Sequence, residues 1–167
     1  MNADELKKLI RDVPDFPKPG IMFRDITPLI GNARGLASIV DQMAEAFLGK
    51  VDAVLGIESR GFILGAALAM QRRKGFVLVR KQGKLPPPVV DVAYDLEYGS
   101  GVLEMQRGSG RLLLIDDVLA TGGTMTAAAE LCLRAGYEVA ALAALIDLNL
   151  VRNYQWRSLR LRAAITY

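Results

Sequence analysis

The sequence predicts one α/β domain, with a mainly parallel sheet flanked by helices. Short apolar runs, each about the length of a buried strand, recur along the chain. Stretches with helical spacing of apolar residues separate these runs, as in domains whose parallel strands are covered on both faces. No repeat, low-complexity tract or linker divides the 167 residues. We therefore expect a single domain over residues 1–167.

The N-terminal segment predicts a short helix followed by irregular structure. Asn2 can cap this helix, with Glu5 completing a capping-box pair. Residues 13–28 are expected to form a constrained loop, because four residues in or near its first half break regular structure: Pro14, Pro17, Pro19 and Gly20.

Helices and buried strands are expected to alternate after this loop. The expected helices cover residues 34–48, 62–70 and 125–134. The expected strands cover residues 53–57, 76–79, 112–115 and 139–146. Gly136 follows the third helix directly and can terminate it.

Two segments depart from this alternation. Residues 91–107 carry β-branched and aromatic residues on both sides of a Gly-Ser-Gly sequence, which predicts a two-stranded excursion with a mobile tip. Residues 157–165 alternate apolar residues with arginine, which predicts a half-exposed terminal strand.

The composition excludes several kinds of site. The chain has no histidine and one cysteine, Cys132, which we expect to lie in the core. A Ser-His-Asp triad, a Cys-His pair, an intrachain disulfide and a cysteine-rich zinc site are therefore excluded. Any metal must be bound through oxygen, and magnesium is the default.

Charge and hydropathy indicate the cellular setting. The net charge of +3 is slight, so it fits either an ordinary surface or an anionic small-molecule substrate, and it gives no dense basic stripe for nucleic acid. The N-terminus is charged, and no apolar run approaches the ~20 residues of a membrane span. We expect a cytoplasmic protein without nucleic-acid or membrane partners.

Residues 111–124 carry the clearest chemical signal. They read as a buried strand ending in Asp116 and Asp117, then a loop of small residues that opens a helix. The backbone N–H groups of residues 121–124 can bind a phosphate at that helix N-terminus. An ordinary turn is the alternative, but two carboxylates beside an anion site make sense if they face ribose hydroxyls. A Walker A lysine and a dinucleotide fingerprint are both absent here.

These residues resemble the motif that binds 5-phosphoribosyl-1-pyrophosphate (PRPP) in the type I phosphoribosyltransferases. Residues 16–28, 56–62 and 80–99 narrow the resemblance to the members of the family that use adenine. The resemblance covers roughly residues 3–147. It implies the type I phosphoribosyltransferase fold, with a small N-terminal hood at 1–33 and a mobile lid hairpin at 91–107.

The resemblance also implies the residues that bind PRPP. Asp116 and Asp117 would hold the ribose hydroxyls, directly or through magnesium bound to PRPP, and no other side chain is expected to bind metal. The 5-phosphate would lie on the loop formed by Ala120, Thr121, Gly122, Gly123 and Thr124. The pyrophosphate would meet Ser59 and Arg60, although Arg60 could instead be a solvated helix start.

A basic cluster and the lid supply further implied roles. The cluster consists of Arg80, Lys81 and Lys84. Its positive charges suit the leaving pyrophosphate, and the alternative is an ordinary solvated loop. In the family such a cluster can serve the neighbouring subunit, which implies a homodimer. Glu97 would handle the protons of the base's imidazole ring, and Tyr98 would cover the reacting centre. Both could also be unremarkable residues of a surface hairpin.

The base would lie against residues 21–25. Phe23 would stack on adenine, unless it packs in the core, and the backbones of Met22 and Arg24 would supply a donor and an acceptor. The implied reaction is transfer of the phosphoribosyl group to adenine, assisted by magnesium, with Arg60, Glu97 and Tyr98 as catalytic residues. A related enzyme for xanthine or hypoxanthine and a non-catalytic PRPP sensor that controls transcription are the alternatives.

Two segments depart from the family pattern. The run Pro86–Pro88 is richer in proline than the family usually is, and could stiffen the base of the lid. The resemblance fades after Asp147, where the chain becomes rich in arginine.

Overall fold

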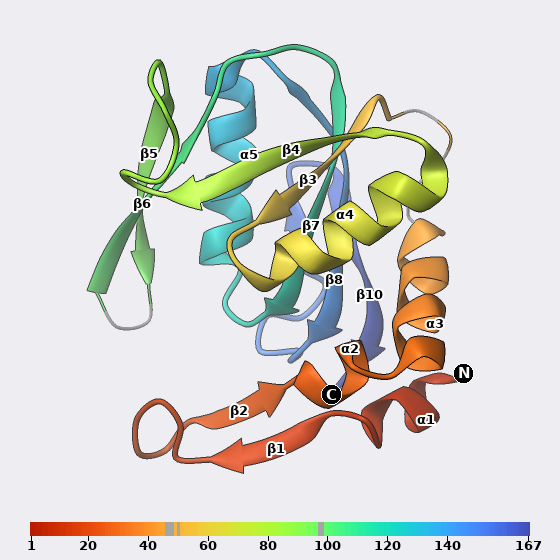
Figure 1. Cartoon of the computed structure of the whole chain (residues 1–167). Coiled ribbons are helices and arrows are strands. Elements are labelled where there is room, and N and C mark those ends of the chain that lie inside the picture. Colours follow the sequence, from red (N-terminus) through yellow and green to blue (C-terminus); the bar gives the residue numbers. More distant parts are fainter. Residues whose placement is uncertain (46–48, 50, 97–98) are drawn as a thin grey trace.

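The computed structural model of the protein describes residues 1–45, 49, 51–96 and 99–167. Within these residues, eight strands form the central sheet in the order β5-β6-β4-β3-β7-β8-β10-β9 (Figure 1). The parallel strands are β3 (Ala53–Ile57), β4 (Gly75–Lys81), β7 (Arg111–Leu119), β8 (Glu138–Asp147) and β10 (Leu159–Thr166). The strands that pair antiparallel are β5 (Val90–Leu96) and β6 (Gly99–Met105) at one end of the sheet and β9 (Gln155–Trp156) at the other. The expected α/β fold with a mainly parallel sheet is confirmed.

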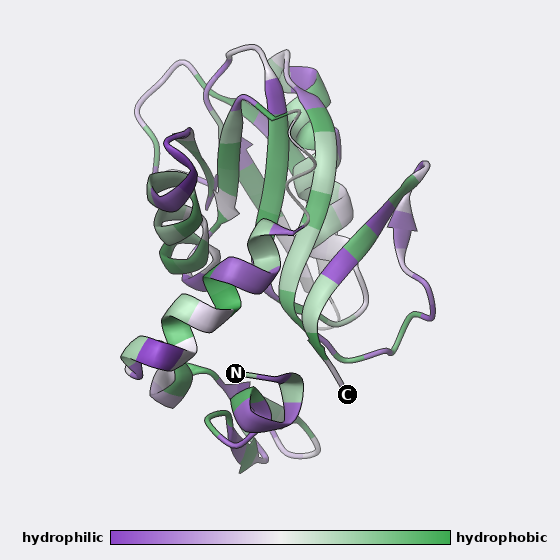
Figure 2. Ribbon diagram, turned by 90° about the vertical axis from the view of Figure 1, so that its right-hand side faces the viewer, coloured by the Kyte–Doolittle hydropathy of each residue, from purple (hydrophilic) through white to green (hydrophobic). Residues whose placement is uncertain are grey.

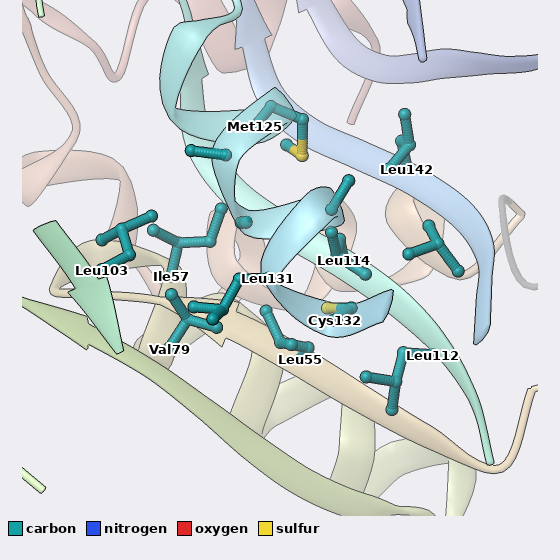
Figure 3. Close-up of a cluster of buried hydrophobic side chains, with 14 of the residues drawn as sticks. Leu55, Ile57, Val79, Leu103, Leu112, Leu114, Met125, Leu131, Cys132 and Leu142 are labelled. Carbon is teal, nitrogen blue, oxygen red and sulfur yellow. The ribbon is translucent and has the colours of Figure 1, made fainter. Parts of the chain in front are cut away.

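Helices cover both faces of this sheet. The cluster of buried side chains on one face includes residues of α3 (Ala33–Ala44) and α4 (Arg60–Arg72). The cluster on the other face contains α5 (Gly123–Ala135), whose Leu131 and Cys132 lie among Leu55, Leu112 and Leu114 of the sheet (Figure 3). The central strands β3, β7 and β8 contain continuous apolar runs because they contribute side chains to both clusters. Cys132 is fully buried, as expected.

The observed elements differ from the predicted ones mainly in length. β7 continues four residues beyond the predicted end at 115, because it keeps pairing with β8 as far as Leu119 and Asp147. α4 begins at Arg60, two residues before the predicted helix. The helix predicted over 34–48 ends at Ala44, and its residues 46–48 lie outside the described residues. Gly136 terminates α5 in a left-handed conformation, as predicted.

The N-terminal hood consists of α1 (Ala3–Lys7), β1 (Arg11–Pro14), β2 (Met22–Asp25) and α2 (Thr27–Ile30). The capping box at Asn2 and Glu5 is present. The loop predicted at 13–28 is wrong, since β1 and β2 pair as an antiparallel hairpin. The prolines permit this pairing because one ends β1 and the other two lie in the connecting loop, where no ladder hydrogen bond is lost.

Hydropathy follows this arrangement. The central strands are mostly hydrophobic, while hydrophilic residues are frequent on the outlying hairpin and in the hood (Figure 2). Among the described residues, no helix is long and apolar enough to cross a membrane.

Candidate active site

Two buried carboxylates lie near the carboxyl end of β7. Asp116 and Asp117 are only 9% and 7% exposed. The Asp117 N–H donates to Asp116 Oδ1 over 2.9 Å. Burial, followed by the neighbouring charge of Asp117, raises the pKa of Asp116 well above its usual range. Two adjacent buried carboxyl groups destabilise a fold, so their presence indicates a ligand that benefits from them.

Arg60 connects these acids with the hood. Its Nε lies 2.8 Å from Asp117 Oδ2, and its guanidinium carbon lies 4.9 Å from the centre of the Phe23 ring. The Asp117 contact is an ion pair without hydrogen-bond geometry, so the buried Oδ2 accepts no hydrogen bond from the described residues. Arg60 therefore balances the charge of a carboxylate oxygen that is shielded from solvent. Gly61 allows the approach of α4, because a Cβ there would lie 2.8 Å from Ile115 O.

The loop from Ala120 to Thr124 joins β7 to α5 at the same end of the sheet. Gly122, the N-cap of α5, has a φ of 85°, which favours glycine. Among the described residues, no side chain caps this helix and no acidic residue lies in its first turn. Its first N–H groups are therefore available to an anion, and the helix dipole favours one.

Two tyrosines that the sequence did not single out contact this loop. The Tyr154 hydroxyl lies 2.7 Å from Thr126 Oγ1 and donates to Gly122 O over 3.3 Å. Tyr94, on β5, lines a cavity together with Thr121, Gly122 and Gly123. Burial raises the pKa of both tyrosines, so both are neutral at pH 7. No sequence signal marked Tyr154, because it lies beyond residues 3–147, where the motifs lie.

Gly122→Ala is expected to weaken PRPP binding and also to lower stability. An added Cβ would lie 2.3 Å from Tyr154 Cε2, and the positive φ strains any other residue by about 1–2 kcal/mol. We therefore expect the melting temperature to fall by several degrees. A fall in PRPP affinity without loss of stability is expected instead for Gly123→Val. Titration calorimetry with PRPP and thermal unfolding test both variants, and unchanged affinity in Gly123→Val would contradict the phosphate site.

A cavity of about 540 Å³ lies between the hood and the sheet. Phe23 lies in its wall and packs edge-to-face on Phe16, with ring centres 5.0 Å apart. Phe23 is thus half-buried at a cavity rather than part of either core cluster. Met22 and Arg24 line the same cavity. The remaining lining residues are Gly20, Ile21, Arg60, Val118, Ala120, Leu148, Leu150 and Tyr167.

The basic cluster is partly engaged within the chain. Arg80 forms an ion pair with Glu58, with Nε 3.2 Å from Oε2, and the Lys81 N–H donates to the same carboxylate over 3.0 Å. Burial alone would raise the pKa of Glu58, but Arg80 and the Lys81 N–H together lower it. Arg80 therefore holds the turn that precedes Ser59 and Arg60. The side chains of Lys81 and Lys84 are exposed.

Glu104, which the sequence did not single out, organises the segment next to this cluster. Its carboxylate is 3% exposed and accepts the N–H groups of Gly83, Lys84 and Leu85 at 2.9, 2.7 and 2.6 Å. Hydrogen bonds from Gly83 first, then from its neighbours, lower the pKa of Glu104. Arg80 donates to Lys84 O over 3.1 Å, so Glu104 and Arg80 together fix the position of Lys84.

Glu104→Gln is expected to destabilise the protein at neutral pH by about 1–3 kcal/mol, because buried N–H groups lose a charged acceptor. The pKa of Glu104 is lowered on folding, so its contribution is present above the unfolded pKa and is lost as the pH falls through the folded value. The melting temperatures of wild type and variant should therefore converge in acid. Glu45→Gln, at an exposed glutamate, is the control. A constant difference between pH 7 and pH 3 would contradict this account.

The structure brings together most of the predicted site residues. Asp116, Asp117 and Arg60 are in contact or adjacent, and the phosphate loop and the cavity flank them. The predicted catalytic residues Glu97 and Tyr98 lie outside the described residues. Their roles stay predictions.

The fold and this site are those of a phosphoribosyltransferase. The family model described as phosphoribosyl transferase domain matches residues 23–156. An adenine phosphoribosyltransferase of Bdellovibrio bacteriovorus is 48% identical over 164 residues, which are 98% of this chain and 99% of that protein. One from Sorangium cellulosum is 53% identical, over 86% of this chain and 74% of its own.

Solved structures agree with these relatives. The adenine phosphoribosyltransferase of Rhodothermus marinus superposes with a TM-score of 0.90 at 43% identity, covering 99% of this chain and 98% of its own. That of Giardia lamblia, complexed with 9-deazaadenine, has a TM-score of 0.92 at 35% identity, covering 100% of this chain and 98% of its own. The chain therefore belongs to the phosphoribosyltransferase family, among the adenine phosphoribosyltransferases.

Proposed function

We propose that the protein transfers the 5-phosphoribosyl group of PRPP to N9 of adenine, giving AMP and pyrophosphate, as a step of purine salvage. The observation that carries this proposal is the position of Arg60, which contacts both the buried acid Asp117 and the aromatic wall of the cavity at Phe23. An anion site, an acid pair and a cavity of base-like size thus meet at one place. The names of the relatives support the proposal, as does the 9-deazaadenine bound to the Giardia enzyme.

Each part of the two substrates can be assigned to one part of the site. The 5-phosphate of PRPP would take the free N–H groups at the start of α5. Asp116 and Asp117 would then face the ribose hydroxyls, and Ser59 and Arg60 would face the pyrophosphate. Adenine would occupy the cavity and stack on Phe23.

In the reaction, the bond from the anomeric carbon to pyrophosphate breaks and a bond to adenine N9 forms. Positive charge develops on the ribose ring as pyrophosphate leaves with the bonding electrons. The carboxylate of Asp117 stabilises that charge, and it does so strongly because it is shielded from water. Basic residues stabilise the leaving group, and Glu97 would accept the N9 proton.

Magnesium fits this site as an ion that PRPP brings. Among the described residues, no group of three or more acidic, cysteine or histidine side chains could hold a metal ion. The carboxylates of Asp116 and Asp117 are oxygen ligands of the kind that magnesium prefers, and its other ligands would come from substrate and water. Magnesium would neutralise charge on the departing pyrophosphate.

The test is product formation by the purified protein. PRPP, adenine and magnesium should give AMP and pyrophosphate in equal amounts, measured by chromatography and a pyrophosphate assay. A PRPP sensor would bind PRPP without making AMP, and that result would overturn the proposal. The homodimer and the cytoplasmic location stay predictions from the sequence.

A further inference from the structure

We infer that Tyr167 is a positioning residue of the base site, which holds the strand that contacts the base through Arg24. This inference rests on the proposed function. Tyr167 lies beyond the sequence motifs, which end at Asp147, and its place in the site comes from its contacts.

Tyr167 joins the central sheet to the hood. Its N–H donates to Asp147 O over 3.0 Å, which fixes it at the end of β10 beside β8. The Arg24 guanidinium carbon lies 4.1 Å from the centre of its ring, and Lys7 Nζ lies 4.9 Å from it. These cations come from β2 and α1, two different elements of the hood, and Figure 1 shows the end of β10 beside them.

Arg24 is held from a second direction. It forms an ion pair with Asp12, its partner across the β1–β2 hairpin, and its side chain is only 20% exposed. The guanidinium therefore lies between an acid of the hood and an aromatic ring of the sheet. Because the side chain is fixed at both contacts, the backbone of Arg24 is fixed as well.

The same ring forms part of the cavity. Tyr167 lines it together with Phe23 and Arg24 of the hood and with Val118 and Leu148 from the sheet side. Burial raises the pKa of Tyr167, Arg24 lowers it and Asp12 raises it, for a net rise. The ring is thus a neutral phenol at pH 7, held by the attraction of the cations to its face.

Loss of the Tyr167 ring should weaken the binding of adenine and leave the binding of PRPP unchanged. Asp117 pairs with Arg60, and the phosphate loop is hydrogen-bonded to Tyr154, so replacing Tyr167 removes neither of these contacts. We expect KM for adenine to rise about tenfold or more in Tyr167→Leu, since two cation–ring contacts are lost. The KM for PRPP and kcat should stay within about threefold of wild type.

Three variants test this inference. Tyr167→Leu keeps apolar volume and removes the ring, Tyr167→Phe restores the ring without the hydroxyl, and Thr166→Ala changes the exposed neighbour. The expected result is a raised KM for adenine in the leucine variant alone, with rescue by phenylalanine. Equal KM values in all three, or a phenylalanine variant that behaves like leucine, would overturn the inference.

Hydrogen exchange supplies a readout that needs no activity. The amides of residues 11–25 should exchange faster in Tyr167→Leu than in wild type or Tyr167→Phe, because the hood loses its attachment to β10. Unchanged exchange there would also contradict the inference. If wild type makes no AMP, the proposed function fails, while the exchange measurement still decides whether Tyr167 holds the hood.

Discussion

Asp117→Asn is expected to lower kcat/KM by roughly 30-fold to 10³-fold, a loss of about 2–4 kcal/mol of transition-state stabilisation. Asparagine keeps the shape of the side chain but removes the charge that faces the ribose. Asp117 is only 7% exposed, so solvent screens its charge little from the substrate. Arg60 also loses the partner 2.8 Å away that orients it between the acids and Phe23.

The control for this variant is Asp52→Asn. Asp52 directly precedes β3 and pairs with Arg111, the first residue of β7, at the end of the strand opposite to Asp117. Its replacement therefore removes a negative charge beside β7 without changing the site. We expect its kcat/KM to equal that of wild type. Steady-state kinetics with both substrates varied, and circular dichroism to verify folding, make the comparison. Near-normal turnover by a folded Asp117→Asn protein would show that the acid pair is structural.

The helices and strands with regular apolar spacing were predictable, because a buried face requires apolar residues at a fixed spacing in the sequence. Strand β3 matched its predicted bounds, since both of its faces are covered and all five residues are apolar or glycine. The last four residues of β7 were not predicted, because polar side chains lie among them. Asp116 and Asp117 interrupt the apolar run, yet the backbone continues to pair with β8. Periodicity records which side chains are apolar, and strand pairing does not depend on that alone.

The site was predictable where its residues are neighbours in the chain, and not where contacts join distant segments. The acid pair and the phosphate loop form one continuous motif. In contrast, Glu104 contacts residues about 20 positions away, and Tyr154 contacts Gly122 across 32 positions. Arg80 was predicted to belong to a basic cluster suited to the leaving pyrophosphate, or to a solvated loop, and its ion pair with Glu58, 22 positions earlier, was not predicted. These contacts exist because the sheet places the ends of separate strands side by side, and no local pattern records that.

Discrimination between adenine and 6-oxopurines is expected to be the largest effect at the base site. Adenine offers an acceptor at N1 and a donor at N6, and hypoxanthine reverses both. Pro14, which has no N–H, lies opposite Met22 in the β1–β2 hairpin, so this pair does not exchange both ladder hydrogen bonds. Because backbone groups of alternate strand residues point the same way, we expect Met22 and Arg24 to direct theirs to the other edge of β2, where a base can meet them.

Backbone groups cannot exchange donor and acceptor roles as a hydroxyl or a water can. An oxopurine would therefore face donor against donor and acceptor against acceptor in the cavity. Each buried mispaired group costs about 1–3 kcal/mol, so two of them predict a preference for adenine of roughly 30-fold to 10⁴-fold.

The measurement is kcat/KM for adenine, hypoxanthine, guanine and xanthine at saturating PRPP and magnesium. Arg24→Ala should lower adenine use, since the Tyr167 contact is lost, but should change the ratio between purines less than Arg24→Pro, which deletes the backbone N–H. The proline variant needs a check of its folding, because β2 pairs with β1 at this residue. If any oxopurine matches adenine in the wild-type protein, the backbone of β2 does not select the base, even where the acid pair and the phosphate loop act as proposed.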